Sequence, residues 1–394
     1  MEIRTPRPVR GSPGPAGSGS RRFARRRKMA GPDPVTSPVS RRQRLAALVS
    51  AGETCLVDPP VLLLASDYFD LAGEEFGRRL LLTEGADGRQ YCLRPDFTLP
   101  IARHHLSLSD PGPASYGYLG PVFRQRAAGP EEFVQAGLEL LGHDDADRAL
   151  ARVFEFLADA MAIHDIRRPD LRLGSIAVFE QLLEELDMPA VWRPRLRRRF
   201  GNRAAMDALL ERLSEPQDET EIRAVPDRKQ LIADISASLR ADGFGLTLGR
   251  TPEEIADRYL EKLALSRARV PARSVRTLQR YLDMSGPLDE VQADIRKLIG
   301  TPGRELLLAL DVLERNAAEL AARFAGAPLR FEAAFSPQLH YYTGLVFEVR
   351  VPGGDVLGSG GQYDRLMQAL GAGNKIAASG CALWVDRLQQ EAGI

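Results

Sequence analysis

Residues 132–139 read EFVQAGLE, and this stretch carries more information about the fold than any other. Alternate residues of a β-strand face the same way, so Gln135, Gly137 and Glu139 are expected to share one face of a sheet. The glycine would leave room for a ligand between two polar side chains. A Gly/Pro loop at 127–130 connects this stretch to an earlier strand-like segment, 115–123. The sequence therefore predicts an antiparallel pair of strands with polar groups on one face.

Further short strands and helices are expected on both sides of this pair. Upstream, a helical pattern at 41–51 is followed by strand-like pieces separated by turn signals, at 54–57, 80–83 and 90–93. Downstream, the pattern predicts a helix at 146–164, a strand at 171–173 and a helix from Val178. The β pattern returns at Leu329, with a strand at 341–351, a glycine-rich turn at 353–361, a helix at 363–370, and a last strand and helix from Ile376.

Residues 182–325 differ in composition from the segments around them. They are rich in Leu, Ala, Glu and Arg and poor in β-branched runs, which is typical of helices. We expect a helical insertion that splits a sheet domain into residues 35–181 and 326–394, after a basic tail at 1–34. The insertion contains an arginine cluster that is either a solvated helix face or a contact for a partner or RNA: Arg193, Arg195, Arg197, Arg198 and Arg199.

Composition limits the class of protein. The chain has 394 residues, 44% of them hydrophobic and 27% charged, which is typical of a globular protein. Its net charge is zero, but nine basic and no acidic residues fall within 3–32, so the rest is acidic and no extended nucleic-acid surface is expected. The Gly/Pro/Ser-rich tail should be disordered. It is interpreted as a mis-assigned start before Met29, a functionless extension, or a nucleic-acid or targeting arm, and it lacks a secretory h-region.

No run of apolar residues is long enough to span a membrane, so no membrane partner is expected. The three cysteines, Cys55, Cys92 and Cys381, are far apart and lack metal-ligand spacing, and the five histidines form no metal-ligand array. We expect no metal and no cofactor, and a reducing cytoplasm fits this cysteine usage.

Six ordered segments carry a resemblance to a known family: 93–98 (LRPDFT), 120–124 (GPVFR), 132–139 (EFVQAGLE), 341–348 (YYTGLVFE), 360–364 (GQYD preceded by Gly360) and 380–387. Together they resemble histidyl-tRNA synthetase, from about residue 41 onward. The resemblance implies an α+β, class II aminoacyl-tRNA synthetase-like fold, with an antiparallel sheet flanked by helices. It also implies a dimer formed through the first motif, around Pro59.

The same resemblance implies a histidine-binding pocket. Asp96, Thr98 and Gln135 would accept hydrogen bonds from the α-ammonium group of histidine. Glu139 and Tyr342 would bracket the imidazole, whose two ring nitrogens need two oppositely placed partners. The full set implied for histidine binding is Asp96, Thr98, Arg124, Gln135, Glu139, Tyr341, Tyr342 and Tyr363.

The chain departs from the synthetase pattern at the positions that perform its chemistry. Pro337 stands where the synthetase has the arginine that grips the carboxylate and α-phosphate, with Gln338 and His340 at the next altered positions. Proline cannot stabilise a developing phosphoryl charge. The second motif reads Arg124-Gln125-Arg126 instead of Arg-x-Glu, although Arg124 and Arg387 match the family's ATP-binding arginines. No catalytic residue is therefore predicted.

The sequence stops seven residues after Arg387, so no anticodon-binding domain is expected. A synthetase-like core that lacks both the catalytic arginine and an anticodon-binding domain resembles the regulatory subunit of the short-form ATP phosphoribosyltransferase. That enzyme catalyses the first step of histidine biosynthesis. The resemblance implies a hetero-oligomer in which a separate catalytic subunit is activated and histidine exerts feedback inhibition. Two alternatives remain at this point: a divergent enzyme that forms an aminoacyl adenylate for a non-tRNA acceptor, and an RNA-binding module.

Overall fold

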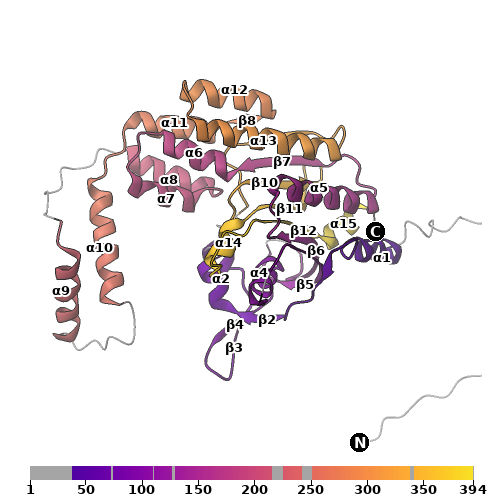
Figure 1. Ribbon diagram of the computed structural model, residues 1–394, viewed down its shortest axis with the longest axis horizontal. Helices are drawn as coiled ribbons and strands as arrows, with labels where there is room; N and C mark the ends of the chain where they lie inside the picture. Colours follow the sequence, from indigo (N-terminus) through magenta and orange to yellow (C-terminus); the bar gives the residue numbers. More distant parts are fainter. Residues whose placement is uncertain are drawn as a thin grey trace, which may run out of the picture.

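A nine-stranded sheet forms the centre of the computed structural model, which describes residues 38–71, 74–109, 111–126, 129–214, 225–241, 251–337 and 341–393 (Figure 1). The predicted disordered tail lies outside these residues, as do Gln338 and His340. The strand order is β1-β5-β6-β12-β11-β10-β7-β9-β8. The three strands nearest the C-terminus, β12, β11 and β10, therefore lie together between β6 and β7 at the centre of the sheet.

The predicted pair of strands is confirmed. β5 (Ala114–Phe123) and β6 (Glu132–Leu141) run antiparallel over their whole length. β6 continues antiparallel to β12 (Ala378–Trp384), and the series goes on through β11 (Val356–Gln362), β10 (Leu345–Arg350) and β7 (Asp170–Ser175). Three short strands complete the edges: β1 (Cys55–Leu56) and β9 (Leu329–Glu332), each parallel to its inner neighbour, and β8 (Ser285–Gly286). The sheet is thus mainly antiparallel, as predicted.

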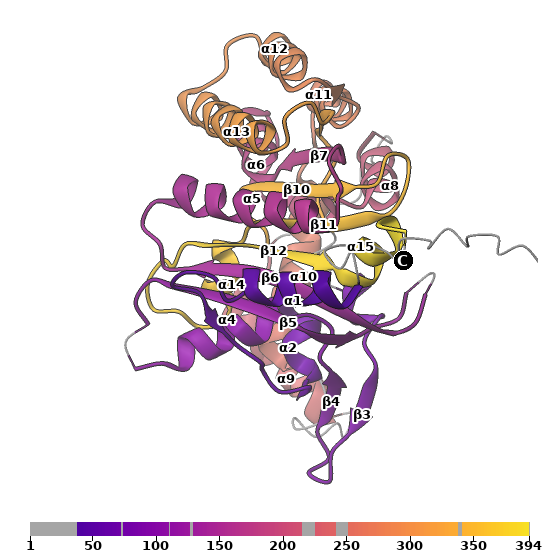
Figure 2. The ribbon, with the colours of Figure 1, turned by 90° about the vertical axis from the view of Figure 1, so that its right-hand side faces the viewer.

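A second, three-stranded sheet lies beside the first. Its order is β2 (Leu62–Leu64), β4 (Gln90–Leu93) and β3 (Leu82–Glu84), all antiparallel. Figure 2 shows the β3–β4 hairpin extending beyond the body of the molecule. The helix α2 (Ala65–Leu71) packs on β4 of this sheet, and α3 (Glu74–Gly77) packs on α2. The next helix, α4 (Thr98–Ser107), packs on β6 of the large sheet.

One face of the large sheet is covered by α5 (Ala146–Ile163), which packs on β6, β11 and β12. Asp145 caps this helix by accepting a hydrogen bond from the backbone N–H of Arg148, at 2.9 Å. Phe154 of α5 meets Phe347 of β10 edge to face, with ring centroids 5.4 Å apart. Because Phe347 lies between Val346 and Glu348 on its strand, those two residues face the opposite side. The remaining helices of this region are α1 (Pro38–Leu48), α14 (Asp364–Ala369) and α15 (Val385–Glu391).

The segment predicted to be helical contains β8 as its one strand among the described residues. Its helices are α6 (Ile176–Glu185), η2 (Ala190–Trp192), α7 (Arg193–Arg199), α8 (Arg203–Ser214), α9 (Arg228–Ala241), α10 (Pro252–Arg267), α11 (Ala272–Leu282), α12 (Leu288–Ile299) and α13 (Arg304–Arg323). The predicted boundary at residue 182 falls inside α6, and α13 returns to pack on α5 and α6. In Figure 1, α9 and α10 form an arm that projects from the body.

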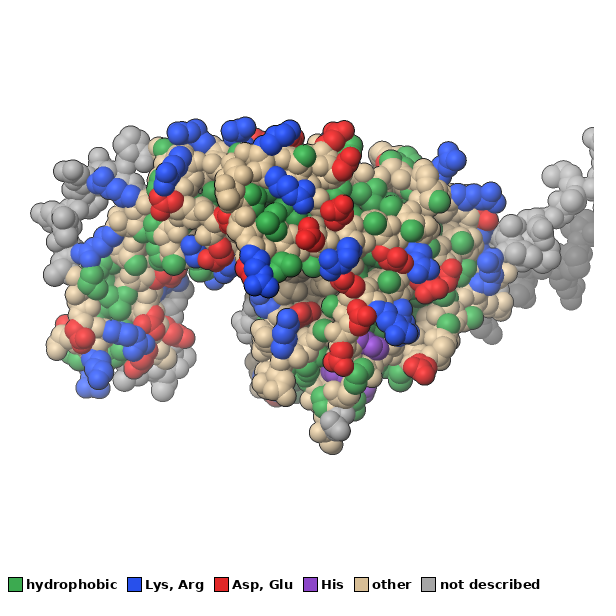
Figure 3. All heavy atoms as spheres, turned by 45° about the horizontal axis from the view of Figure 1, so that its top comes forward, with side chains coloured by type: hydrophobic (Ala, Val, Ile, Leu, Met, Phe, Trp, Pro, Cys, Tyr) green, Lys and Arg blue, Asp and Glu red, His purple; other side chains and the backbone are tan. Residues whose placement is uncertain are grey.

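The arginine cluster on α7 is largely occupied by ion pairs within the chain. Arg193 and Arg197 contact Glu184, and Arg195 contacts Glu261 at 3.2 Å. On the face drawn in Figure 3, basic and acidic side chains are interspersed. These contacts favour the interpretation of the cluster as an ordinary helix surface.

The prediction of a glycine-rich turn over 353–361 is wrong, because the turn is shorter than expected. Only its beginning turns, at Gly353, whose φ of 65° favours glycine. Residues from Val356 onward form β11, and their glycines serve close packing instead: a Cβ at Gly360 would lie 2.8 Å from the Cα of Cys381 on β12. The strand predicted at 341–351 begins only at Leu345, so Tyr341 and Tyr342 project from a loop.

Arg94 fastens the small sheet to the large one, and its loss should destabilise the fold. Its buried guanidinium donates to the carbonyls of Pro59 and Pro121 and lies over the Phe97 ring, 4.0 Å from the centroid. We expect Arg94→Ala to lower the free energy of unfolding in urea by about 3 kcal/mol, because it leaves a cavity and unpaired carbonyls. Arg103→Ala, which removes a half-exposed pair with Asp67, should cost less than about 1 kcal/mol. Equal losses would contradict this role.

Candidate functional site

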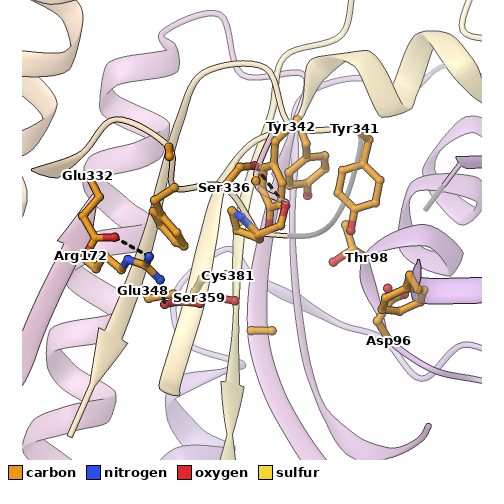
Figure 4. Close-up of a pocket in the computed structure, with 18 of the residues that line it drawn as sticks. Asp96, Thr98, Arg172, Glu332, Ser336, Tyr341, Tyr342, Glu348, Ser359 and Cys381 are labelled. Carbon is orange, nitrogen blue, oxygen red and sulfur yellow. Dashed lines mark hydrogen bonds and ion pairs between the residues drawn. The ribbon is translucent and has the colours of Figure 1, made fainter. Parts of the chain in front are cut away.

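All eight residues of the predicted pocket line a single cavity of about 660 Å³ on the face of the large sheet that α5 does not cover. They come from the β4–α4 junction, from β5–β6, from the loop before β10 and from the start of α14: Asp96, Thr98, Arg124, Gln135, Glu139, Tyr341, Tyr342 and Tyr363. Figure 4 shows part of this arrangement, with Asp96 and Thr98 at one end and Arg172 and Glu332 at the other.

Glycines hollow the sheet beneath the cavity. One row of paired residues runs across five neighbouring strands, β6, β12, β11, β10 and β7. Its members, in that order, are Glu139, Gly380, Gly361, Val346 and Gly174. A Cβ at Gly380 would overlap Oε2 of Glu139, and one at Gly174 would overlap the carbonyl oxygen of Phe335. The missing side chains therefore admit the Glu139 carboxyl and the loop before β10 onto the sheet surface.

The role expected for Gly137 needs correction. The space that its missing side chain leaves is taken by the hydroxyl of Tyr118, directly opposite on β5, and not by an open volume for a ligand. That hydroxyl donates to the carbonyl oxygen of Cys381 at 3.2 Å. The Tyr118 ring stacks on Phe97 with centroids 4.3 Å apart. Gly137 thus shapes the pocket indirectly, by letting Tyr118 pack under it.

Glu139 is the most confined polar group of the cavity, with 1% of its surface exposed. Its Oε1 accepts a hydrogen bond from Thr98 Oγ1 at 2.6 Å, and its Oε2 accepts one from the Tyr363 hydroxyl. Burial raises the pKa of this carboxyl to about 8, and the two hydrogen bonds only partly oppose that rise. Near neutral pH the carboxyl therefore holds its proton and can exchange it with a ligand.

Asp96 and Arg124 form the charged end of the cavity. Burial raises the pKa of Asp96 to about 6, although the positive charge of Arg124 opposes this. The Tyr68 hydroxyl donates to Asp96 at 3.3 Å. Burial lowers the pKa of Arg124 to about 10, so its guanidinium remains charged at neutral pH while it donates to the carbonyl of Pro95. This end thus offers an anionic and a cationic group to a zwitterion.

Gln135 and three tyrosines complete the predicted set. Gln135 is buried, and its Oε1 has no hydrogen-bond partner among the residues that the structure describes. Tyr341 and Tyr342 lie 5.3 Å apart between ring centroids, and both are within 6.3 Å of the Tyr363 ring. All three are buried, and burial raises the pKa of each. The rings form an aromatic wall beside the Glu139 carboxyl.

The sequence analysis missed the other end of the cavity. There Arg172 of β7 pairs with Glu332 of β9 and lies 3.4 Å from Glu348 of β10, which in turn accepts a hydrogen bond from Arg350 at 2.9 Å. Arg172 also lies over the ring of Phe335, 4.1 Å from its centroid. Only the strand order brings these residues together. The one signal in the sequence is the alternation of charged and apolar residues along 345–350.

The positions compared with the synthetase pattern, altered at Pro337 and Arg126 and retained at Arg387, have local roles in this structure. Pro337 lines the cavity without a charged group. Arg126 pairs with Asp386 at 2.9 Å and covers the Phe133 ring at 4.3 Å, while Arg387 donates to the carbonyl of Val356 at 2.8 Å.

In the part of the chain that the structure describes, no three His, Cys, Asp or Glu side chains gather as a metal site, and no helix has the length and apolar character needed to cross a membrane.

Comparison with known proteins agrees with this fold. The family model for histidyl-tRNA synthetase matches residues 36–241 and 254–388. A solved structure from Bacillus halodurans C, described as an ATP phosphoribosyltransferase regulatory subunit/histidyl-tRNA synthetase, superposes with a TM-score of 0.63 at 19% identity, covering 91% of this chain and 79% of that one. A histidine–tRNA ligase subunit from Alicyclobacillus acidocaldarius gives 0.53 at 22% identity, covering 96% and 99%. The family-model match and the fold thus define a histidyl-tRNA synthetase-like protein of class II.

More similar relatives narrow this class. The ATP phosphoribosyltransferase regulatory subunit of Rhizobium rhizogenes is 38% identical over 358 residues, covering 88% of this chain and 95% of the relative. That of Agrobacterium fabrum is 39% identical over 359 residues, covering 87% and 94%. The chain belongs to the family of ATP phosphoribosyltransferase regulatory subunits, which confirms the predicted regulatory, non-catalytic role.

The raised pKa of Glu139 makes the stability of the fold depend on pH. Between its ordinary value near 4.5 and about 8, the folded chain keeps a proton that the unfolded chain has lost. The free energy of unfolding should therefore fall as the pH rises through this window, by up to about 1.4 kcal/mol per pH unit. Asp96 adds a fall of the same sign below about pH 6.

We expect Glu139→Gln to flatten this dependence between pH 6 and 8, because glutamine carries no titrating proton. Urea unfolding at several pH values measures it, with Glu132→Gln, an exposed residue of the same strand, as the control. An unchanged slope in Glu139→Gln would show that this carboxyl does not titrate as described.

Proposed function

We propose that histidine is the ligand of the cavity and that its binding controls a separate catalytic subunit of ATP phosphoribosyltransferase. The names of the relatives and the cavity support this proposal, since a regulatory subunit needs an effector site and a partner. The partner would join ATP and phosphoribosyl pyrophosphate to form phosphoribosyl-ATP and pyrophosphate. Product histidine would then limit its own synthesis.

The single observation that carries the proposal is a buried carboxyl beside an aromatic wall, Glu139, in the same cavity as two opposite charges, Asp96 and Arg124. Asp96 and the unpaired Oε1 of Gln135 are acceptors suited to an α-ammonium group, and Thr98 offers its oxygen nearby. Arg124 is a cation suited to the α-carboxylate. Glu139 and Tyr342 would take the two imidazole nitrogens.

Proton balance favours an imidazole at Glu139. The carboxyl holds its proton up to about pH 8, and a free imidazole is neutral above its pKa of about 6.5. Between these values the neutral imidazole keeps its one N–H and the carboxyl keeps its own proton, so the pair has no net charge and can be buried without the penalty of an unpaired ion. An aliphatic or purely anionic side chain would leave the carboxyl without a partner, which disfavours such ligands.

Control of the partner follows from linkage. If histidine binds one arrangement of the hetero-oligomer more tightly than another, its binding shifts the population toward that arrangement. A histidine that bound all arrangements equally would change nothing. The catalytic subunit must therefore contact a part of this chain that responds to occupancy of the cavity.

An aminoacyl-adenylate function is less well supported. Pro337 places no charge near the cavity, and Arg126 is paired with Asp386 and covers Phe133. Arg387 is bonded to the carbonyl of Val356. One of the two arginines that match ATP-binding positions, Arg387, is thus engaged within the chain, while the other, Arg124, lines the cavity.

Histidine inhibition should depend on the Glu139 carboxyl. We expect the wild type to stimulate phosphoribosyl-ATP formation by a short-form catalytic subunit from the same organism, and histidine to reverse this. In Glu139→Gln the half-inhibitory histidine concentration should rise roughly ten- to a hundredfold, the value of one charge-assisted hydrogen bond. Stimulation without histidine should persist, and the exposed Glu132→Gln should behave like the wild type.

Two results would count against the regulatory mechanism. One is a chain that neither stimulates the catalytic subunit nor makes it sensitive to histidine. The other is amino-acid-dependent exchange of pyrophosphate into ATP by this chain alone, which would favour adenylate chemistry.

We further propose that two copies of the chain form a dimer through the segment around Pro59. Leu56 and Leu62 flank it with 58% and 50% of their surfaces exposed, and Val61 is also exposed. Leu56 lies on β1, at the edge of the large sheet, Leu62 begins β2, and Val61 directly precedes β2. An apolar edge of this kind is stabilised when a second copy covers it.

Leu62→Asp should convert the dimer to a monomer, because it places a charge in the covered apolar surface. Sedimentation velocity measures this, with Leu308→Asp on α13 as a control of similar exposure, 45%. A wild type that sediments as a monomer, or a Leu62→Asp variant that remains dimeric, would contradict the proposed interface.

We also propose that the protein works in the cytoplasm and without nucleic acid. Its three cysteines are all free thiols, which a reducing compartment preserves. The pairing of the α7 arginines with glutamates leaves less positive charge for phosphate contacts.

A further inference from the structure

The loop of residues 333–337 forms one wall of the cavity and is held between the sheet and the helical segment. Ala334, Phe335, Ser336 and Pro337 all line the cavity. On the sheet side, the loop rests on β7 where Gly174 lacks a side chain, and the ring of Phe335 lies over Arg172. The position of this wall therefore depends on what presses on its other side.

The helical segment presses on the loop at two points. At the first, the N–H of Ala333 donates to the carbonyl of Met284, just before β8, at 3.0 Å. At the second, Gly201, in the connection between α7 and α8, lies against Ser336. A Cβ at Gly201 would lie 2.8 Å from the carbonyl oxygen of Ser336 and 3.0 Å from its Cβ. Gly201 itself lines the cavity.

The connection at Gly201 is fixed by its own packing. Gly201 has a φ of 86°, a backbone conformation that residues other than glycine rarely adopt. The preceding residue, Phe200, stacks on Phe179 of α6 with ring centroids 4.0 Å apart. Both phenylalanines also line a space of about 30 Å³ that Ser336 and Tyr342 share. Tyr342, the proposed partner of the imidazole, is thus backed by the same helices.

We propose that Gly201 is a positioning residue for histidine, through which the α7–α8 connection and the cavity are coupled. A shift of this connection moves Ser336, which lines the cavity and shares the small space beside Phe200 with Tyr342. The coupling is reciprocal, because any change in the helices that alters histidine affinity must itself respond to histidine. The inference rests on histidine as the ligand, and it assigns the α7–α8 connection as the route by which occupancy reaches the helical segment.

A matched pair of glycine substitutions tests the proposal. Gly201→Ala introduces a methyl group that presses against Ser336. Gly300→Ala introduces the same group at the end of α12, where φ is 80° and nothing lies within 4 Å of the new atom. Both positions have a positive φ, but only Gly201 lies against a residue that lines the cavity. Calorimetric titration should show histidine binding weakened about tenfold in Gly201→Ala, within the usual range for coupled sites. In Gly300→Ala the change should stay within about twofold.

Hydrogen exchange in the wild type supplies a test that needs no variant. Addition of histidine should slow exchange at residues 196–206, across the connection, and leave α1 on the far side of the molecule unchanged. Thermal unfolding of both variants identifies a loss of affinity that is due only to a misfolded Gly201→Ala.

Three outcomes are informative against the proposal. Equal histidine affinity in the two variants would overturn it, and so would histidine-dependent protection confined to the sheet. A wild type that binds no histidine would instead overturn the proposed function, on which the inference depends.

Discussion

The structure around the cavity depends on burying one carboxyl group, that of Glu139, within the face of a sheet. A buried acid is costly unless its oxygens have partners and its backbone neighbours make room. Thr98 and Tyr363 supply the partners, and Gly380 supplies the room. These residues belong to four different elements, so the β4–α4 junction, β6, β12 and the start of α14 must all keep their places for the acid to be tolerated.

The same constraint explains how a synthetase-like fold can serve regulation. The residues proposed to recognise histidine line one cavity on the sheet. Adenylation needs further groups that hold ATP. Here Pro337 replaces an arginine of the synthetase pattern, and Arg126 replaces a glutamate and is paired with Asp386. A binding site without turnover is what an effector requires.

Much of this could be predicted from sequence, since it depends on local rules. Alternation along 132–139 and the connecting loop predicted β5, β6 and the shared face of Gln135 and Glu139. The predicted strand 90–93 and helix 146–164 follow from periodicity in the same way. The features that could not be predicted from the sequence depend on neighbours that are remote along the chain. Glycines at 358–361 suggested a turn, but they are small because β12 lies against them. The pairing of Arg172 with Glu332 and Glu348 requires the strand order, which no local pattern contains.

The position of β12 has a consequence for how the protein is made. Residues 378–384 lie between β6 and β11 in the middle of the sheet, and they complete the wall beside Glu139. When a nascent chain has emerged from the ribosome only up to the helical segment, it contains β5 and β6 but not β12. The edge of β6 that pairs with β12 in the complete sheet is then open. Such long-range strand insertion is a slow step in folding and leaves the edge exposed to misassembly until it is finished. Ligand recognition therefore arises late in biogenesis, and a truncated product should be unable to act as a competing regulator.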